Sequence, residues 1–321
     1  MAAHDNERMN PSPLARPAGA LAPDGIVRLH DWGVIRCAGP EAAQFLHGQL
    51  TQDVEQLGTD VARLAGYCSA KGRLLASFIV VRPAPDEVLL ACSADLLAAT
   101  LRRLSMFVLR AKCKLSDASA ELQVYGAAGA TAAAIGLRAG QCRSTDDGHW
   151  IGLADAAGVP RVLHLRVASA AAPALPALDG AAWGWLEVAS GVPRIVAATG
   201  ERFVPQMANL ELVGGVNFQK GCYPGQEVVA RSQYRGTLKR RSFLFASPVA
   251  AQPAQEVFDP TDPGQPAGMV VNAASWHGST LVLAEVKLGA IERGSLRLAR
   301  ADGPALQPLA LPYSVPIEAA A

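Results

Sequence analysis

The chain has 321 residues, half of them hydrophobic, with 29 basic and 28 acidic side chains and a formal net charge of +1. This length exceeds what one hydrophobic core usually organises, so two or three domains are expected. The balanced charge excludes a chain-wide basic field for bulk nucleic-acid binding but leaves a local basic patch open, and no run approaches the roughly 18 apolar residues that a membrane helix needs.

The cysteines favour a reducing compartment over a metal site. No Cys-x-x-Cys pair occurs among the six cysteines, so the sequence predicts neither a zinc ribbon nor an iron–sulfur cluster held by the protein. A chain with reduced thiols fits the cytoplasm. The first 25 residues carry Asp5 and Glu7 and lack an apolar signal-peptide segment, so residues 1–25 are expected to form a flexible tail.

The ordered part is expected to begin near Ile26 and to alternate strands with helices. Short apolar runs bounded by turn residues predict strands, and apolar residues at helical spacing after Gly39-Pro40-Glu41 predict the first helix. This alternation is typical of α+β or α/β layers. The expected strands are 26–29, 33–37, 74–81, 88–92 and 121–125, and the expected helices are 39–50, 93–108 and 181–191.

Beyond Gly236 the pattern changes to short hydrophobic runs between Gly, Pro and Asp turns. Such a pattern indicates a small antiparallel barrel or sandwich. The sequence therefore places a domain boundary near residues 235–238. The strands expected in this part are 238–245, 255–258, 267–271 and 279–286.

The most chemically loaded segment is 220–231, which reads Lys-Gly-Cys-Tyr-Pro-Gly-Gln-Glu-Val-Val-Ala-Arg. Pro224 suits the first turn of a helix, where its missing N–H would have no partner anyway. A helix is therefore expected over 225–231, with Glu227 and Arg231 paired four residues apart.

Cys222 would then precede a helix N-terminus, with Lys220 two residues away. The partial positive charge of the helix end and the lysine ammonium both favour a thiolate, so Cys222 is a candidate reactive centre. The alternative is a small buried hydrophobic cysteine at a turn, which is the usual state of a free cysteine.

The string Lys-Gly-Cys-Tyr-x-Gly-Gln-Glu, followed by a basic residue, resembles the signature of the YgfZ family of folate-binding proteins, which is related to the T-protein (aminomethyltransferase) of the glycine cleavage system. The resemblance implies an α+β, T-protein-like folate-binding fold. Two α+β subdomains within 26–236 and a C-terminal antiparallel β-barrel at 237–321 would surround a central hole for a reduced folate. Further matches lie at 29–32, 45–54, 68–73, 203–216, 234–236 and 311–314.

The resemblance also implies a cofactor, tetrahydrofolate or a derivative of it. Trp32 and Trp183 correspond by position to two tryptophans of the family's pterin-binding surface, and we assign Tyr223 and Arg231 to the folate as well. A flat heteroaromatic ring stacks on aromatic faces, which makes tryptophan suitable. Without the resemblance, Trp32 and Trp183 would be taken for core residues.

The sequence departs from the T-proteins at the position of a catalytic carboxylate. T-proteins carry an Asp-Asp pair about four residues into the strand that follows the Gly-rich entry. Here that position holds Ala76 and Ser77. Loss of a positioned acid or base costs on the order of 10²–10⁴-fold in rate, so glycine cleavage is not expected.

The preferred hypothesis is a folate-binding accessory factor that assembles or repairs iron–sulfur clusters, including those of enzymes that methylthiolate tRNA. Its partners would be iron–sulfur enzymes or cluster-assembly proteins, with transient tRNA contact and no membrane. Cys222 would react, Lys220 would lower its pKa, and Gln226 and Glu227 would orient the thiol or a ligand.

Three alternatives stay open. One is a folate-dependent one-carbon (aminomethyl) transferase, which needs a carboxylate near the folate amine. Another is a folate-dependent demethylase, which normally adds a flavin domain. The third is a tRNA-binding module without chemistry. The basic segment 234–241, with four cations between 235 and 241, is a candidate contact for folate glutamates, a partner or tRNA, and equally a solvated strand end.

Overall fold

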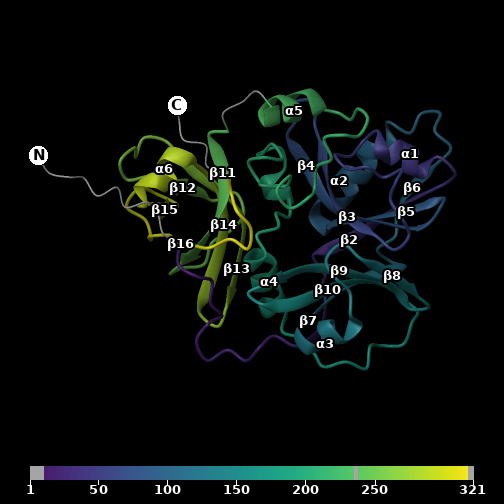
Figure 1. Cartoon of the computed structure of the whole chain (residues 1–321), viewed down its shortest axis with the longest axis horizontal. Coiled ribbons are helices and arrows are strands. Elements are labelled where there is room, and N and C mark those ends of the chain that lie inside the picture. The colour runs from purple at the N-terminus through teal and green to yellow at the C-terminus, as the bar shows by residue number, and fades with distance from the viewer. Residues whose placement is uncertain (1–10, 235–237, 317–321) are drawn as a thin grey trace, which may run out of the picture.

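The computed structural model describes residues 11–234 and 238–316, and in these residues three antiparallel sheets surround the centre of the molecule (Figure 1). Helices are segregated from the strands rather than alternating with parallel ones, so the predicted α+β class is confirmed. The strand orders are β3-β4-β5-β2-β6, β1-β7-β10-β9-β8 and β15-β12-β13-β14-β11-β16.

The first sheet is buried on both faces. Along β4 the side chains of Phe78 and Val80 pack toward the helices, whereas those of Ile79 and Val81 pack toward the molecular centre. Burial on both sides explains why this strand reads as a nearly continuous apolar run. Its elements are β2 (Trp32–Ala38), β3 (Ala62–Cys68), β4 (Leu74–Ala84), β5 (Glu87–Ser93) and β6 (Lys114–Asp117), with α1 (Ala42–His47) and α2 (Ala94–Ser105).

The second sheet carries α4, the most apolar helix of the fold. Trp183, Trp185 and Leu186 of α4 are buried, and the helix packs between β7 of this sheet and β13 of the C-terminal sheet. A helix that is hydrophobic on most sides belongs inside a protein. The elements are β1 (Gly25–Arg28), β7 (Leu122–Ala128), β8 (Cys142–Thr145), β9 (Gly148–Ala156), β10 (Val159–Val167), α3 (Gly129–Ile135) and α4 (Gly180–Ala189).

The C-terminal part is a six-stranded sheet that curls in the manner of a barrel (Figure 1). Its strands alternate with tight turns, as the short hydrophobic runs predict. The elements are β11 (Arg240–Ser247), β12 (Glu256–Phe258), β13 (Gly268–Trp276), β14 (Ser279–Lys287), β15 (Arg297–Leu298), β16 (Gln307–Leu309) and α6 (Leu288–Arg293); the connection to it holds a 3₁₀ turn, η1 (Ala197–Thr199), and α5 (Gln226–Tyr234).

Several element boundaries differ from the predictions. The first helix ends at His47 instead of residue 50, because the following chain turns to let the Thr51 side chain bond with Gly66 and Gly215. The β9–β10 hairpin was not predicted. Long-range pairing with β7 holds β10 in the sheet, and pairing of this kind leaves little local signal in the sequence.

The two predicted domain boundaries stay predictions. Residues 1–10 and 235–237 lie outside the described part of the chain. Within the segment predicted as tail, Ser12 forms a parallel bridge with Leu309 of the C-terminal sheet, whereas the Asp24 carboxylate accepts a hydrogen bond from the Thr131 backbone N–H at the second sheet. None of the described helices is long and apolar enough to cross a membrane.

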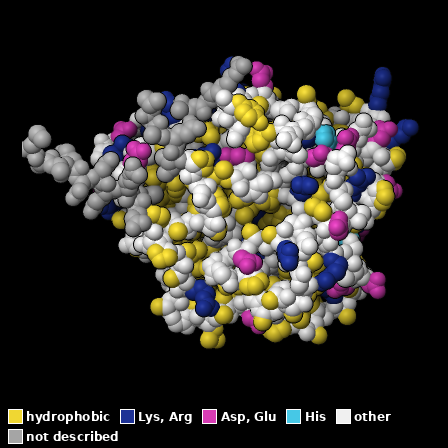
Figure 2. Space-filling model, viewed as in Figure 1, with side chains coloured by type: hydrophobic (Ala, Val, Ile, Leu, Met, Phe, Trp, Pro, Cys, Tyr) yellow, Lys and Arg dark blue, Asp and Glu magenta, His cyan; other side chains and the backbone are white. Residues whose placement is uncertain are grey.

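Charged side chains are dispersed over the face drawn in Figure 2, with Lys and Arg interspersed among Asp and Glu. This distribution agrees with the balanced composition of 29 basic and 28 acidic residues. This face carries no single-sign field over its whole extent.

Candidate functional site

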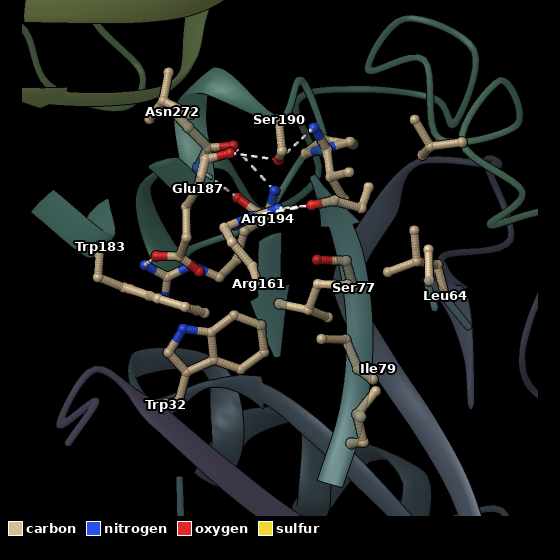
Figure 3. A pocket seen from close by; sticks show the side chains of 18 of the residues that line it. Trp32, Leu64, Ser77, Ile79, Arg161, Trp183, Glu187, Ser190, Arg194 and Asn272 are labelled. Carbon is tan, nitrogen blue, oxygen red and sulfur yellow. Dashed lines mark hydrogen bonds and ion pairs between the residues drawn. The ribbon is translucent and has the colours of Figure 1, made fainter. Parts of the chain in front are cut away.

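A cavity of about 950 Å³ lies where the three sheets meet (Figure 3). Its size suits an organic ligand of cofactor dimensions, since ligand pockets usually measure roughly 300–1,000 Å³. Every sheet contributes to its wall. Among the lining residues are Trp32 of β2, Ser77 and Ile79 of β4, Arg161 of β10, Trp183 and Glu187 of α4, Arg194 of the following loop, and Asn272 of β13.

The two tryptophans predicted to bind folate, Trp32 and Trp183, both line this cavity. The guanidinium carbon of Arg194 lies 5.0 Å from the centroid of the Trp32 ring, and that of Arg161 lies 5.6 Å from the Trp183 ring. The buried Trp183 indole N–H lacks a hydrogen-bond partner among the described residues, whereas the Trp32 indole N–H lies near the Glu187 carboxyl and lowers its pKa. An unpaired buried donor is costly, so the Trp183 N–H is available to a bound ligand.

Glu187 is the carboxylate that the sequence analysis missed. It follows Trp183 by one helical turn of α4, so both side chains face the cavity (Figure 3). Burial raises the pKa of the Glu187 carboxyl, and the positive charge of Arg194 opposes this shift. A signal was present in the sequence, because Glu187 is the one charged residue in an otherwise apolar helix.

Arg194 contacts residues from three different parts of the cavity wall. Its Nη2 lies 2.5 Å from an Asp31 carboxylate oxygen and 3.6 Å from a Glu187 carboxylate oxygen. Its backbone N–H donates to Asn272 Oδ1 over 2.9 Å, and the Asn272 amide donates back to its carbonyl over 2.8 Å. One residue therefore holds the first sheet, α4 and the C-terminal sheet around the cavity.

The strand position that holds a carboxylate in T-proteins carries no acid here. Ser77 faces the cavity, and its Oγ accepts a hydrogen bond from the Ile195 backbone N–H over 2.9 Å. Ala76 is buried on the opposite face of β4. The acids at the cavity wall come from other elements, namely Asp31, Asp155 and Glu187.

The signature segment lies apart from this cavity. Lys220, Cys222, Tyr223, Gln226, Glu227 and Arg231 are all described, and none lines the cavity. The structure thus brings Trp32 and Trp183 together but leaves Tyr223 and Arg231 elsewhere. Glu227 and Arg231 are both exposed and form no ion pair with each other in the described structure, so the predicted pairing is wrong.

Lys220 points into the fold. Its Nζ donates hydrogen bonds to the carbonyl oxygens of His47 and Leu50, at the C-terminal end of α1, and lies 4.8 Å from the centroid of the Tyr223 ring. Cations at this end of a helix satisfy carbonyls that have no partner within the helix. Burial lowers the pKa of Lys220 to about 8. Lys220 therefore anchors the signature segment to α1.

Cys222 is the exposed cysteine among the six, since the other five are buried or half-buried. It stands four residues before α5 begins, at Gln226. Gly225 fixes the turn between them, because its φ is +78° and an added Cβ would lie 2.4 Å from the Ser69 carbonyl oxygen. The predicted helix after Pro224 is confirmed, and Cys222 is presented at the surface ahead of it.

A histidine lies beside this segment. His47 Nδ1 is 3.0 Å from Asp53 Oδ1, and its Nε2 is 3.4 Å from the position that a Cβ on Gly221 would take. A carboxylate at Nδ1 favours the tautomer that leaves Nε2 as acceptor. The imidazole is thus oriented toward the residue next to Cys222. Within the described residues no group of three or more His, Cys, Asp and Glu side chains is placed to hold a metal ion.

Known proteins resemble this chain over most of its length. The tRNA-modifying protein YgfZ of Serratia proteamaculans is 29% identical over 325 residues, covering 95% of this chain and 97% of that protein. The protein of the same name from Edwardsiella ictaluri is 33% identical over 251 residues, covering 72% and 74%. No family model matches the chain.

A solved structure shares the fold. The glycine cleavage system aminomethyltransferase T from Bartonella henselae superposes with a TM-score of 0.72 at 16% identity, covering 91% of this chain and 87% of that one. The predicted T-protein-like fold is therefore confirmed. With this fold, the signature around Cys222 and relatives of this similarity, the chain belongs to the YgfZ family.

Proposed function

We propose that this protein is a folate-binding accessory factor that supports tRNA modification by assembling or repairing iron–sulfur clusters of the modifying enzymes. The observation that carries the folate part is the cavity of about 950 Å³, with Trp32, Trp183 and Glu187 on its wall. Relatives named as tRNA-modifying proteins support the cellular context.

The cavity wall matches the chemistry of a reduced folate. A pterin has a flat ring with adjacent N–H donors, and a carboxylate such as Glu187 accepts two of them at once. The Trp32 and Trp183 side chains supply aromatic surface, and Trp183 adds an indole N–H donor that is unpaired among the described residues. Arg63 lines the same cavity, is exposed and forms no ion pair in the described structure, so it is suited to a glutamate carboxylate of the folate tail.

Cys222 would carry the thiol chemistry outside the cavity. An exposed thiol can meet a cluster that is still held by another protein, whereas a cavity thiol could not. Gln226 and Glu227 stand at the start of α5 and would orient this contact. The buried Tyr223 ring contacts the Lys220 ammonium and so stabilises the segment that carries Cys222.

The second candidate is folate-dependent one-carbon transfer, which the buried acid Glu187 favours. In that case an acid at the cavity would position the folate amine, and Cys222 would be dispensable. The two candidates therefore differ in which residue is required for activity.

The test is complementation of a bacterium that lacks its own family member, with tRNA methylthiolation as the readout. Wild type should restore the modification, Cys222→Ala should not, and the half-buried Cys113→Ala serves as the matched control. Tetrahydrofolate binding is measured by tryptophan fluorescence. The Cys222→Ala variant should bind tetrahydrofolate like wild type, and the Trp32→Ala variant should bind it more weakly. Full restoration by Cys222→Ala would contradict a thiol-dependent role, and glycine-cleavage activity would support the second candidate.

A further inference from the structure

A group of large apolar side chains is exposed directly after α2. Met106 is 65% exposed, Phe107 44% and Leu109 88%. Leu109 also has a φ of +43°, a conformation that residues other than glycine seldom adopt. Contiguous exposed apolar side chains are typical of an interaction site.

Basic residues flank these apolar side chains in the sequence. Between residues 96 and 116 the sequence contains no acidic residue but five basic ones. All five are exposed, and none takes part in an ion pair within the described structure. We call this set, together with the three apolar residues, the α2-end surface; its cations are Arg102, Arg103, Arg110, Lys112 and Lys114.

The five cations of this surface are unpaired within the described residues, as Arg63 at the cavity also is, whereas several other arginines pair with carboxylates. Elsewhere arginines such as Arg36, Arg240 and Arg293 are paired with carboxylates. Next to the α2-end surface, the Glu41 carboxylate accepts a hydrogen bond from the Lys112 backbone N–H over 2.9 Å. Asp86 and Glu87 lie at the same edge, because the Gly39 N–H donates to the Asp86 carbonyl and Ala38 pairs with both Glu87 and Lys114. Five cations against these three acids leave a local excess of positive charge.

We propose that the α2-end surface docks RNA. This inference rests on the proposed role in tRNA modification and names the contact surface for it. Unpaired cations attract the phosphate backbone, and the half-exposed Phe107 ring offers a face on which an unpaired base stacks. None of residues 102–114 lines the large cavity, so RNA and folate would bind at separate places.

The experiment measures binding of an unmodified tRNA transcript to the full chain by fluorescence anisotropy at two salt concentrations. With five phosphate contacts, affinity should fall by roughly 10²-fold between about 50 and 200 mM salt. The double variant Arg110→Glu/Lys112→Glu should bind at least about tenfold more weakly and should show a smaller salt slope. Phe107→Ala should weaken binding of the tRNA by roughly fivefold or more.

A matched control keeps the same change in net charge. Arg16→Glu/Arg138→Glu alters two exposed arginines that lie outside this surface and form no ion pair in the described structure, and it should bind tRNA like wild type. Circular dichroism and thermal unfolding check that every variant folds.

Two results would overturn the proposal. One is equal loss of tRNA binding in the two double variants. The other is sedimentation of the protein with vesicles of phosphatidylcholine and phosphatidylserine, without tRNA binding, which would assign the surface to a membrane. Complementation separates the two ideas: if wild type restores the modification in a Cys222-dependent way but binds no tRNA, the docking proposal fails while the proposed function stands.

Discussion

At the scale of single residues, Glu187 is expected to lower the free energy of unfolding near neutral pH while strengthening folate binding. Burial raises the pKa of Glu187 above its usual value of 4.5, so the folded state holds the proton to a higher pH than the unfolded chain does. The stability that this group contributes is complete below that unfolded value and is lost as the pH rises through the folded pKa.

Glu187→Gln should therefore increase the free energy of unfolding near pH 7, and this gain should shrink as the pH falls toward 4.5. The same change should weaken tetrahydrofolate binding by about 10–100-fold, because a charged acceptor is lost. Urea unfolding at several pH values and fluorescence titration measure the two effects. The exposed Glu256→Gln is the control, and an unchanged folate affinity would remove Glu187 from the binding site.

Lys220 allows a second prediction with a defined pH dependence. Lys220→Met should reduce the free energy of unfolding by about 1–3 kcal/mol, because the carbonyls of His47 and Leu50 lose their donor. Since burial lowers the folded pKa to about 8, the folded state releases the proton before the unfolded chain does, and wild-type stability should rise relative to the variant as the pH rises through 8. Urea unfolding between about pH 7 and about pH 10 measures the free energy of unfolding of wild type and Lys220→Met. If the stability of wild type relative to the variant falls as the pH rises, Lys220 does not have a lowered pKa in the folded state.

The His47–Asp53 pair leads to a third prediction at this scale. If Nε2 of His47 accepts the Cys222 proton, His47→Ala should slow alkylation of Cys222 by about tenfold near neutral pH, and Asp53→Asn should slow it less. Mass spectrometry after limited iodoacetamide treatment locates and times the modification. The Cys222→Ser variant serves as the control without a thiol at this position. Equal rates in wild type and both variants would leave the pair a structural role.

At the scale of elements, the approach of α4 to β7 decides the shape of the cavity. A Cβ on Gly126 would lie 2.6 Å from ring atoms of Trp183. Gly126→Ala should therefore displace the indole, reduce the free energy of unfolding by about 1–3 kcal/mol and weaken folate binding. Gly184→Ala within α4 meets Ala274 at an ordinary 3.7 Å and should not destabilise the fold. Urea unfolding compares the two, and equal stability would show that the packing adapts.

The elements also show where sequence patterns suffice. The β4 and β11 runs and the helix after Pro224 were predicted because apolar periodicity and turn residues are local signals. The β9–β10 hairpin and the short β6 strand were missed, since their place depends on pairing with β7 and β2. The Glu227–Arg231 pair was predicted from spacing alone and is not formed, because exposed side chains gain little from such contacts.

At the scale of the whole molecule, one ligand would stabilise three sheets together. The cavity wall draws residues from every sheet, so unfolding of any one part destroys the site. Tetrahydrofolate at about 100 times its dissociation constant should raise the free energy of unfolding by about 2.7 kcal/mol in a single transition. Thermal unfolding should show this rise in wild type and in Cys222→Ala alike, and a smaller one in Trp32→Ala. A rise confined to an early partial transition would place the ligand within one sheet.

The amino-acid sequence by itself determined the family, the α+β class and the two tryptophans of the cavity. The family, and through the resemblance the two tryptophans, follow from contiguous strings such as 220–227, and the α+β class follows from these strings together with local periodicity. Neither signal depends on distant contacts. Only the tertiary structure decided that Glu187 and Arg194 join the tryptophans and that Cys222 lies outside the cavity. The reason is separation along the chain: Arg194 meets Asp31 across 163 residues, and Lys220 meets His47 across 173.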